Sequence, residues 1–391
     1  MTSVRILAVS DSDSYLKWSH ALLRHAASDE GHLVHEVVLS NVLSPSVDQM
    51  IAAAGGTVDR VGIMGLVARV RALRPDAVLV SCTGPALEVV IDTLHAAGLL
   101  GPTNPGRPVL VTGFPGITVP ANELALRFRR HVDLVIVHSR RELREHRALA
   151  ASLGLPTRFA LARLPFLPDS AEPGTAAARG AARDRQDVLF AAQSLVPAQE
   201  EQRRAILEAL ADVPDGMRPV VKVRAGVGER QAHNEDLPYA ELDPDPRIMF
   251  RAGSMADALQ RTRGFVTVSS TAVLEALAMG IPSIVLSDFG VDDAMITTVF
   301  TGSGLLGTLD DVRAGRFAHP HPDWLEDNYF HNRSDDEWLD ELAHLVSEPR
   351  VPVHVEPFGD VKTRARRWVR VCVPPRCGRI APGPLRGPRG R

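Results

Sequence analysis

Residues 265–289 read FVTVSSTAVLEALAMGIPSIVLSDF, and this stretch carries the clearest indication of the fold class. The apolar run 265–268 indicates a buried β-strand, the run 272–279 has the composition and pattern of a helix, and 283–286 indicates a second strand. A glycine and a proline separate the helix from the second strand. A strand, a helix and another strand in such close succession predict a parallel sheet that is covered by helices.

The turn between the first strand and the helix carries three hydroxyl side chains, Ser269, Ser270 and Thr271. Hydroxyls and free backbone N–H groups at the start of a helix meet where the helix dipole is positive, which favours a bound phosphate. Glu275 follows Thr271 by one helical turn, where its carboxylate can accept hydrogen bonds from the two hydroxyls of a ribose. The turn therefore predicts a nucleotide site. The alternative is an ordinary strand–helix unit with a capping hydroxyl and a solvated Glu275.

The same alternation of apolar runs and amphipathic runs extends over most of the chain. In the first half we expect strands at 4–9, 33–39, 77–82, 108–112, 134–138 and 159–164, and helices at 15–27, 64–73, 85–97, 121–131 and 141–153. In the second half we expect strands at 188–192, 219–223, 248–250, 265–268 and 283–286, and helices at 199–211, 255–261, 272–279, 335–346 and 361–371.

Residues 168–186 lose this periodicity and gather proline, glycine, alanine and charge, which is typical of an exposed linker. We therefore expect an α/β protein with two facing Rossmann-like domains and late C-terminal helices. The N-terminal domain would cover 1–167, and the C-terminal domain with its closing helices would cover 187–373. Ligands of such sheets bind beyond the carboxyl ends of the strands, so residues that directly follow a strand are the candidate site residues.

The composition is that of a globular protein. Of the 391 residues, 45% are hydrophobic and 23% are charged, and the chain is long enough for two hydrophobic cores. It has no run of about 20 apolar residues that would span a bilayer and no signal peptide before the first strand, so we expect a cytoplasmic protein. Three cysteines make no disulfide framework.

The C-terminal end is strongly basic, because residues 362–391 carry ten Arg and Lys and no acid within a net charge of −3. The last part, 374–391, is rich in proline, glycine and arginine, and we expect it to be disordered. One reading is a solvated tail. The other is contact with anionic headgroups at the inner face of the membrane, or with nucleic acid, although we expect no specific nucleic-acid binding.

The run 265–282 resembles the nucleotide-binding segment of GT-B glycosyltransferases, in which a strand, a small-hydroxyl turn and an E-A-L-A-x-G-x-P helix form the donor site. Its pair Ser269 and Ser270 is similar to the phosphate-binding serine motif of bacterial sialyltransferases and polysialyltransferases. The run also resembles capsule-polymer and teichoic-acid transferases and the fold-related UDP-N-acetylglucosamine 2-epimerases. The resemblance implies a donor on the C-terminal domain and an acceptor on the N-terminal domain.

A second candidate lies at the end of the strand 219–223, where Lys222 and Arg224 alternate and so share a face. Two cations aimed at a cleft suit a pyrophosphate or a sugar carboxylate. Sialyltransferase-like enzymes commonly carry a His-Pro pair here, whose histidine serves the leaving phosphate, and this chain lacks that pair. Lys222, Arg224 or His233 of the following loop would take that role. Ordinary surface charges are the alternative.

Other candidates also follow predicted strands. Gln193 and Ser194 follow 188–192, a position from which GT-B proteins contribute to the donor site, with helix capping as the alternative. Asp11 and Asp13 follow the first strand, where a carboxylate can act as the base on an acceptor hydroxyl or can cap the next helix.

The segment after the strand 108–112 is rigid and rich in glycine and proline. This segment, with Arg127 of the following helix, either contacts the acceptor or forms a rigid turn that binds no ligand. Its candidate residues are Gly113, Phe114, Pro115, Gly116 and Arg127.

These observations favour a glycosyltransferase that moves a sugar or a sugar acid from a nucleotide-activated donor to a hydroxyl of a cell-surface glycan or lipid precursor. We expect no metal and no other cofactor, because no cluster has the spacing of metal ligands. A nucleotide-sugar epimerase on the same fold is one alternative. A non-catalytic protein that binds a nucleotide-sugar or a polymer is the other.

Overall fold

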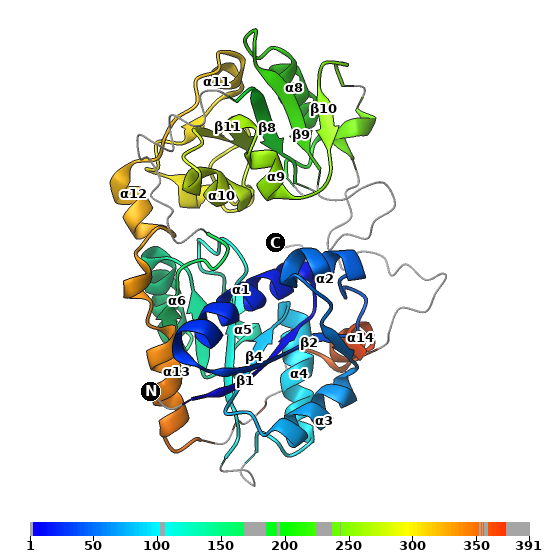
Figure 1. Ribbon diagram of the computed structural model, residues 1–391, viewed down its shortest axis with the longest axis vertical. Helices are drawn as coiled ribbons and strands as arrows, with labels where there is room; N and C mark the ends of the chain where they lie inside the picture. The colour runs from blue at the N-terminus through cyan, green and yellow to red at the C-terminus, as the bar shows by residue number, and fades with distance from the viewer. Residues whose placement is uncertain are drawn as a thin grey trace.

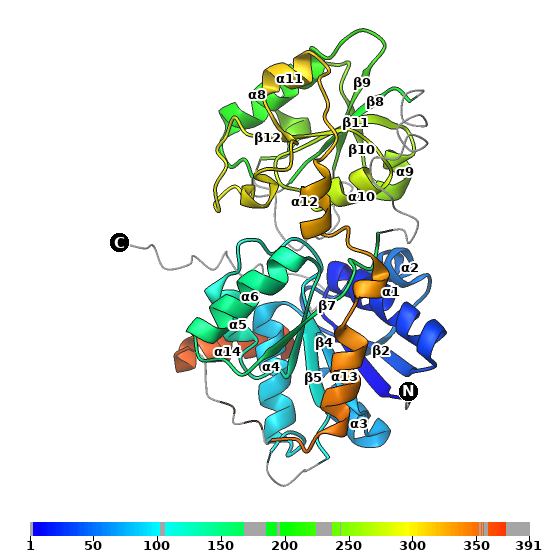
Figure 2. The same cartoon turned by 90° about the vertical axis from the view of Figure 1, so that its left-hand side faces the viewer.

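The computed structural model describes residues 3–101, 106–167, 185–193, 196–223, 237–242, 244–351, 353, 355 and 359–372. Two parallel β-sheets with helices packed on them form two domains, which lie one above the other in Figures 1 and 2. The predicted α/β fold class is confirmed. Most of the predicted linker 168–186 and the whole of the predicted tail 374–391 lie outside the described residues.

The first domain is built on a seven-stranded parallel sheet in the order β3-β2-β1-β4-β5-β6-β7. Its central strands are apolar on both sides because helices cover both faces. The strands are β1 (Arg5–Ser10), β2 (Leu33–Leu39), β3 (Asp59–Val61), β4 (Ala77–Ser81), β5 (Val109–Gly113), β6 (Leu134–Val137) and β7 (Arg158–Leu161). The pattern of the sequence does not indicate β3, a short and largely exposed edge strand.

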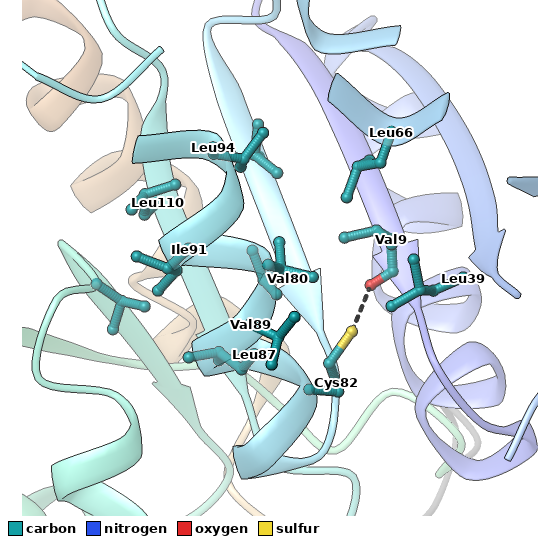
Figure 3. Close-up of a cluster of buried hydrophobic side chains, with 14 of the residues drawn as sticks. Val9, Leu39, Leu66, Val80, Cys82, Leu87, Val89, Ile91, Leu94 and Leu110 are labelled. Atoms are coloured by element: carbon teal, nitrogen blue, oxygen red, sulfur yellow. Dashed lines mark hydrogen bonds between the residues drawn. The ribbon is translucent and has the colours of Figure 1, made fainter. Parts of the chain in front are cut away.

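The helices of this domain are α1 (Asp13–Glu30), α2 (Val47–Ala54), α3 (Ile63–Leu73), α4 (Gly84–Ala96), α5 (Glu123–Phe128) and α6 (Arg140–Ser152). Helix α1 packs Trp18 and Leu22 on one face of the sheet. Helices α3 and α4 pack Leu66 and Leu87 on the other face, where Figure 3 shows the Sγ of Cys82 donating to the Val9 carbonyl at 3.4 Å. Apolar side chains of the helices therefore cover both faces of β1 and β4, and this packing fixes the position of the carboxyl ends of the two strands.

The second domain repeats this plan with a six-stranded sheet in the order β10-β9-β8-β11-β12-β13. Its strands are β8 (Asp187–Ala191), β9 (Arg218–Lys222), β10 (Met249–Arg251), β11 (Thr262–Thr267), β12 (Ser283–Leu286) and β13 (Leu306–Gly307). Its helices are α8 (Glu200–Ala211), α9 (Met255–Leu259), α10 (Ala272–Ala278) and α11 (Leu309–Arg313). Helices α9 and α10 pack on one face of this sheet and α8 and α11 on the other.

After the second sheet the chain returns to the first domain through α12 (Pro322–Asp327), α13 (Trp338–Ser347) and α14 (Val361–Cys372). Figure 2 shows α13 running down beside the first sheet. Trp338 and Leu342 of α13 are buried in the same core cluster as Ile6 of β1. Helix α14 packs against α4. The sequence groups α13 and α14 with the second domain, whereas in space both pack on the first.

In each sheet the strand order reverses once, between β1 and β4 in the first and between β8 and β11 in the second. Doubly wound sheets bind their ligands beyond the carboxyl ends of the strands at this switch point. The two domains touch at these ends, since a Cβ placed on Gly116 would lie 2.9 Å from the Thr271 Oγ1. Among the described residues, no helix has the length and apolar character that a bilayer crossing requires.

Candidate active site

In the second domain, the structure brings Gln193 and the serine motif together at the switch point. Gln193 follows β8 and Ser269 follows β11, the neighbouring strand. The Gln193 Oε1 accepts the backbone N–H of Ser269 at 2.8 Å and its hydroxyl at 3.1 Å. One neutral amide therefore fixes the end of both strands. Ser194, the other candidate in this loop, lies outside the described residues.

In the turn into α10, side chains of the turn accept hydrogen bonds from its own backbone N–H groups. The N–H of Ser270 donates to the Thr267 Oγ1 at 3.0 Å, and the N–H of Ala272 donates to the Ser270 Oγ at 3.3 Å. Helix α10 has only seven residues. Two of the N–H groups predicted to be free for a phosphate, those of Ser270 and Ala272, are therefore already bonded to side chains of the same turn. The hydroxyls of Ser270 and Thr271, both partly exposed, are what this turn offers to a ligand.

Glu275 faces the first domain. Its Oε1 lies 3.6 Å from the Nζ of Lys17 on α1, and its side chain is 19% exposed. The same ammonium lies 4.8 Å from the centre of the Phe166 ring. Glu275 is thus an interdomain residue rather than one on a solvated helix face. The sequence does not mark Lys17 as a site residue, since nothing in a helical pattern shows which residue meets another domain.

Lys222 ends β9 and is buried at the same edge of the sheet. It pairs in register with Ala191 of β8, two residues before Gln193. Its Nζ donates to the Val223 carbonyl at 2.8 Å, and burial lowers the pKa of its ammonium. A desolvated cation gains much from an incoming phosphate. Arg224 and His233, the other candidates for this role, lie outside the described residues.

Arg203 of α8 donates hydrogen bonds to backbone carbonyls at this edge of the sheet. Its side chain is buried, with 2% exposure. Its guanidinium donates to the carbonyls of Gln193 and Leu237 and lies 4.8 Å from the centre of the Tyr239 ring. Arg203 therefore positions the loop that carries Gln193.

In the first domain, Asp11 occupies the position that Gln193 has in the second. It follows β1, and its Oδ2 accepts the N–H of Thr83 at 3.0 Å and the Thr83 hydroxyl at 2.5 Å. Thr83 follows β4, the strand across the switch point. The Oδ1 of Asp11 is buried with no hydrogen-bond partner among the described residues, and burial raises the pKa of the carboxyl. Asp13, the other candidate base, is the first residue of α1.

A cation and a phenol lie close to Asp11. Arg129 is 3% exposed, its Nη2 donates to the Tyr15 hydroxyl at 3.1 Å, and its guanidinium lies 4.0 Å from the centre of the Phe114 ring. Burial raises the pKa of Tyr15, and the charge of Asp11 contributes. The predicted Arg127 is instead exposed and paired with Glu123, because it lies on the outer side of α5. Arg129, which no sequence pattern indicates, is the buried arginine close to Asp11.

The glycine- and proline-rich segment after β5 belongs to the first domain and contacts the second. Gly113 leaves no room for a side chain, since a Cβ there would lie 2.5 Å from the Trp18 ring. Phe114 is buried under Arg129, and Pro115 is partly buried. Gly116 abuts Thr271, so the predicted acceptor-side segment touches the predicted donor-side turn.

A buried carboxylate holds this segment in place. Glu142 of α6 is fully buried and accepts the N–H of Thr118, the N–H of His138 and the Tyr329 hydroxyl, the last at 2.6 Å. Tyr329 belongs to the part of the chain that returns from the second domain. The ring of His138 is buried with both nitrogens hydrogen-bonded, to Trp18 and to the Ala162 carbonyl, so this histidine is structural.

The edge that results has two halves with different chemistry. The first domain contributes the carboxylate of Asp11, and the second contributes hydroxyls, Glu275 and the buried ammonium of Lys222. Within the described part of the chain, no three His, Cys, Asp or Glu side chains are grouped so that they could hold a metal ion.

Solved structures share this two-domain architecture. The UDP-GlcNAc 2-epimerase of Neisseria meningitidis, bound to UDP-GlcNAc, has a TM-score of 0.55 and 11% identity over 87% of this chain and 99% of its own. The Anabaena protein HepE, in complex with UDP-glucose, has a TM-score of 0.52 and 14% identity over 88% of this chain and 99% of its own. At this level of identity the likeness shows the GT-B fold alone.

The chain has no significant match among curated protein sequences. A family described as "Putative glycosyltransferase (DUF6716)" matches residues 6–345. The matched span includes both sheets and every candidate residue named above, and it supports transferase activity. The chain belongs to this family, DUF6716.

Proposed function

We propose that the protein transfers a sugar from a nucleotide-activated donor on the second domain to a hydroxyl of an acceptor on the first. The observation that carries this proposal is a matching pair of contacts at the two switch points, Asp11 with Thr83 and Gln193 with Ser269. Each pair lies where a doubly wound sheet binds its ligand. One pair contains a carboxylate and the other does not, so the two domains have different tasks.

The proposed donor is a UDP-sugar. Solved structures of this fold were obtained with UDP-glucose and UDP-GlcNAc, which supports this choice. The CMP-sugar that the serine motif suggests is the second candidate, and the lack of a His-Pro pair after β9 counts against it. Glu275 would accept hydrogen bonds from the ribose hydroxyls, and these would replace its contact with Lys17. Lys222 and the hydroxyls of the turn into α10 would hold the phosphates.

Asp11 is the proposed base. As the acceptor oxygen forms its bond to the anomeric carbon of the donor sugar, the bond from that carbon to the phosphate breaks. The acceptor hydroxyl proton passes to the Asp11 carboxylate, whose raised pKa brings it closer to a working pH. Lys222 stabilises the negative charge that gathers on the leaving phosphate. The acceptor would be a glycan or a lipid precursor of the cell surface.

Nucleotide binding is the first test. Thermal shift and calorimetric titration with UDP, CMP, GDP and their sugars would measure binding, because a ligand of the native state raises its stability. A clear response to UDP and UDP-sugars supports the donor. A response to CMP alone would replace it with a sugar acid donor.

Turnover is the second test. Release of free nucleotide only when an acceptor is present would support the transferase. Conversion of the sugar without an acceptor would identify an epimerase. Tight binding with no turnover on a broad acceptor panel would identify a non-catalytic binding protein.

A further inference from the structure

Helix α14 is fixed on the first domain by one side only. Val371 is 3% exposed and belongs to the core cluster that covers β1 and β4. Arg367 pairs with Glu88 of α4, and its guanidinium lies 4.9 Å from the centre of the Phe128 ring. These contacts determine which residues of α14 face the protein and which face outward.

The outward side of α14 has two stripes of different character. One is apolar and contains Val361, Trp368 and Val369, which are 79%, 51% and 56% exposed. The other is basic and contains the exposed residues Lys362, Arg366 and Arg370. At about 100° per residue, residues 361, 365, 368 and 369 fall on one half of the outer face and 362, 366 and 370 on the other.

We propose that this outer face of α14 binds a lipid bilayer with anionic headgroups. A helix that lies in the plane of a membrane surface needs apolar side chains, tryptophan among them, that enter the headgroup boundary, and Lys or Arg side chains beside them. The outer face of α14 presents both. The sequence that follows adds five arginines and no acid between 373 and 391, which increases the attraction to an anionic surface.

The apolar stripe decides between a membrane and a nucleic acid. Phosphate contacts of a nucleic acid require the basic side chains and have no use for two exposed valines. The inference does not depend on the proposed reaction, because α14 packs against α4 and contributes none of the candidate site residues. It would nevertheless bring the proposed acceptor domain to the surface where a lipid-linked acceptor resides.

Tryptophan fluorescence offers a direct readout of this contact in the full-length protein. The chain has four tryptophans, and Trp18, Trp324 and Trp338 are buried at 0%, 6% and 4% exposure. Trp368 is therefore the tryptophan whose emission should respond to a surface. Adding vesicles of 70% phosphatidylcholine and 30% phosphatidylglycerol should shift the emission to the blue, and acyl-chain-brominated lipids should quench it. Vesicles of phosphatidylcholine alone should give little change.

Vesicle co-sedimentation of variants assigns the binding to this face. Trp368→Ser should weaken binding about tenfold, whereas Trp368→Phe should retain it. Replacing Lys362 and Arg366 with Gln should weaken binding about 25-fold and reduce its dependence on salt. The matched controls are Met64→Ser on α3 and Arg263→Glu on β11, which change an exposed apolar residue and an exposed basic residue elsewhere.

Three results would overturn the proposal. Trp368→Ser could bind vesicles like the wild type, which would assign any attraction to the arginines beyond α14. The controls could lose as much binding as the α14 variants. The protein could instead bind duplex DNA or RNA through its basic residues with no effect of Trp368→Ser, which would identify a nucleic-acid surface. Unchanged nucleotide binding and an unchanged unfolding midpoint show that each variant is folded.

Discussion

The switch points of the two sheets are built alike and differ in one group. In each, the side chain after the first strand accepts the N–H and the hydroxyl of a residue that follows the strand across the switch. The first domain uses the carboxylate of Asp11 with Thr83, and the second uses the amide of Gln193 with Ser269. The neutral amide of Gln193 adds no negative charge at the second switch point, where the phosphate is proposed to bind. A buried anion gives the first edge a group that can take up a proton.

The surroundings follow the same division. Two ionisable groups lie near Asp11, the buried Arg129 and the partly buried Tyr15, in hydrogen-bond contact with each other. At the second edge Lys222 is buried, with burial lowering the pKa of its ammonium. We infer that the fold repeats a scaffold and that the choice of one side chain assigns proton transfer to one domain and nucleotide binding to the other. Substitutions in both domains test this comparison.

The largest effect is expected from Asp11→Asn. Removing the base should lower acceptor-dependent kcat by about 10²- to 10⁴-fold, with nucleotide affinity unchanged because the donor side is intact. Steady-state kinetics and calorimetric titration measure the two quantities. Asp13→Asn, two residues away on α1, is the matched control and should keep most of the activity. Equal losses in both variants would remove Asp11 from its proposed role.

The same residue should show in the pH dependence. Burial raises the pKa of Asp11, so activity should fall with decreasing pH at a higher pH than for an ordinary aspartate. An acid whose folded pKa is raised lowers stability as pH rises from its unfolded pKa, about 4, through its folded pKa. Across that interval the wild type should therefore lose free energy of unfolding relative to Asp11→Asn. Parallel stability curves would show that Asp11 does not titrate in this range.

On the second domain, Glu275→Ala should weaken nucleotide binding by about 1.5–3 kcal/mol, the value of a hydrogen bond to a charged group. Lys17→Met is the matched control, because it removes the interdomain partner of Glu275 and keeps the carboxylate. Such a partly exposed ion pair contributes about 1 kcal/mol or less, so Lys17→Met should change affinity little. Equal effects in titration calorimetry would mean that Glu275 acts through Lys17 and does not contact the ribose.

The two glycines after β5 separate core packing from domain contact. Gly113→Ala would place a Cβ 2.5 Å from the Trp18 ring and 3.0 Å from the Ile136 carbonyl, so the free energy of unfolding should fall by about 1–3 kcal/mol. Gly116→Ala meets the hydroxyl of Thr271, which can rotate away, so its stability should stay within about 0.5 kcal/mol of the wild type. Urea denaturation measures both. A larger loss of stability in Gly116→Ala than in Gly113→Ala would show that the tighter contact is the one between the domains.

The smallest effect is the coupling between Lys222 and Ser270. If both hold one phosphate, Lys222→Ala and Ser270→Ala should each reduce affinity, and the double variant should lose less than the sum by about 0.5 kcal/mol or more. The control cycle pairs Lys222→Ala with Ser287→Ala, whose residue follows β12 and donates to the Gly307 carbonyl. Additivity in both cycles would place the two groups on separate parts of a ligand.

The sequence predicts most of the fold, because apolar runs of four to seven residues are visible without knowledge of their partners. The strands β3 and β13 escape this pattern, since they have three and two residues at sheet edges. The candidate site is predicted where a residue directly follows a strand, as for Asp11 and Gln193. Prediction fails where the direction of a side chain depends on distant packing: Arg129 is buried against the Phe114 ring, whereas Arg127 two positions earlier is exposed.

The return of the chain to its first domain also has a consequence during synthesis. Trp338 and Leu342 fill the core beside β1, so the first domain lacks part of its interior until residue 342 has left the ribosome. Domains near the N-terminus generally fold first, and here the one made first is completed last. A ribosome-bound chain that ends near residue 330 should therefore expose an apolar sheet face to chaperones, and protease sensitivity of such stalled chains would reveal it.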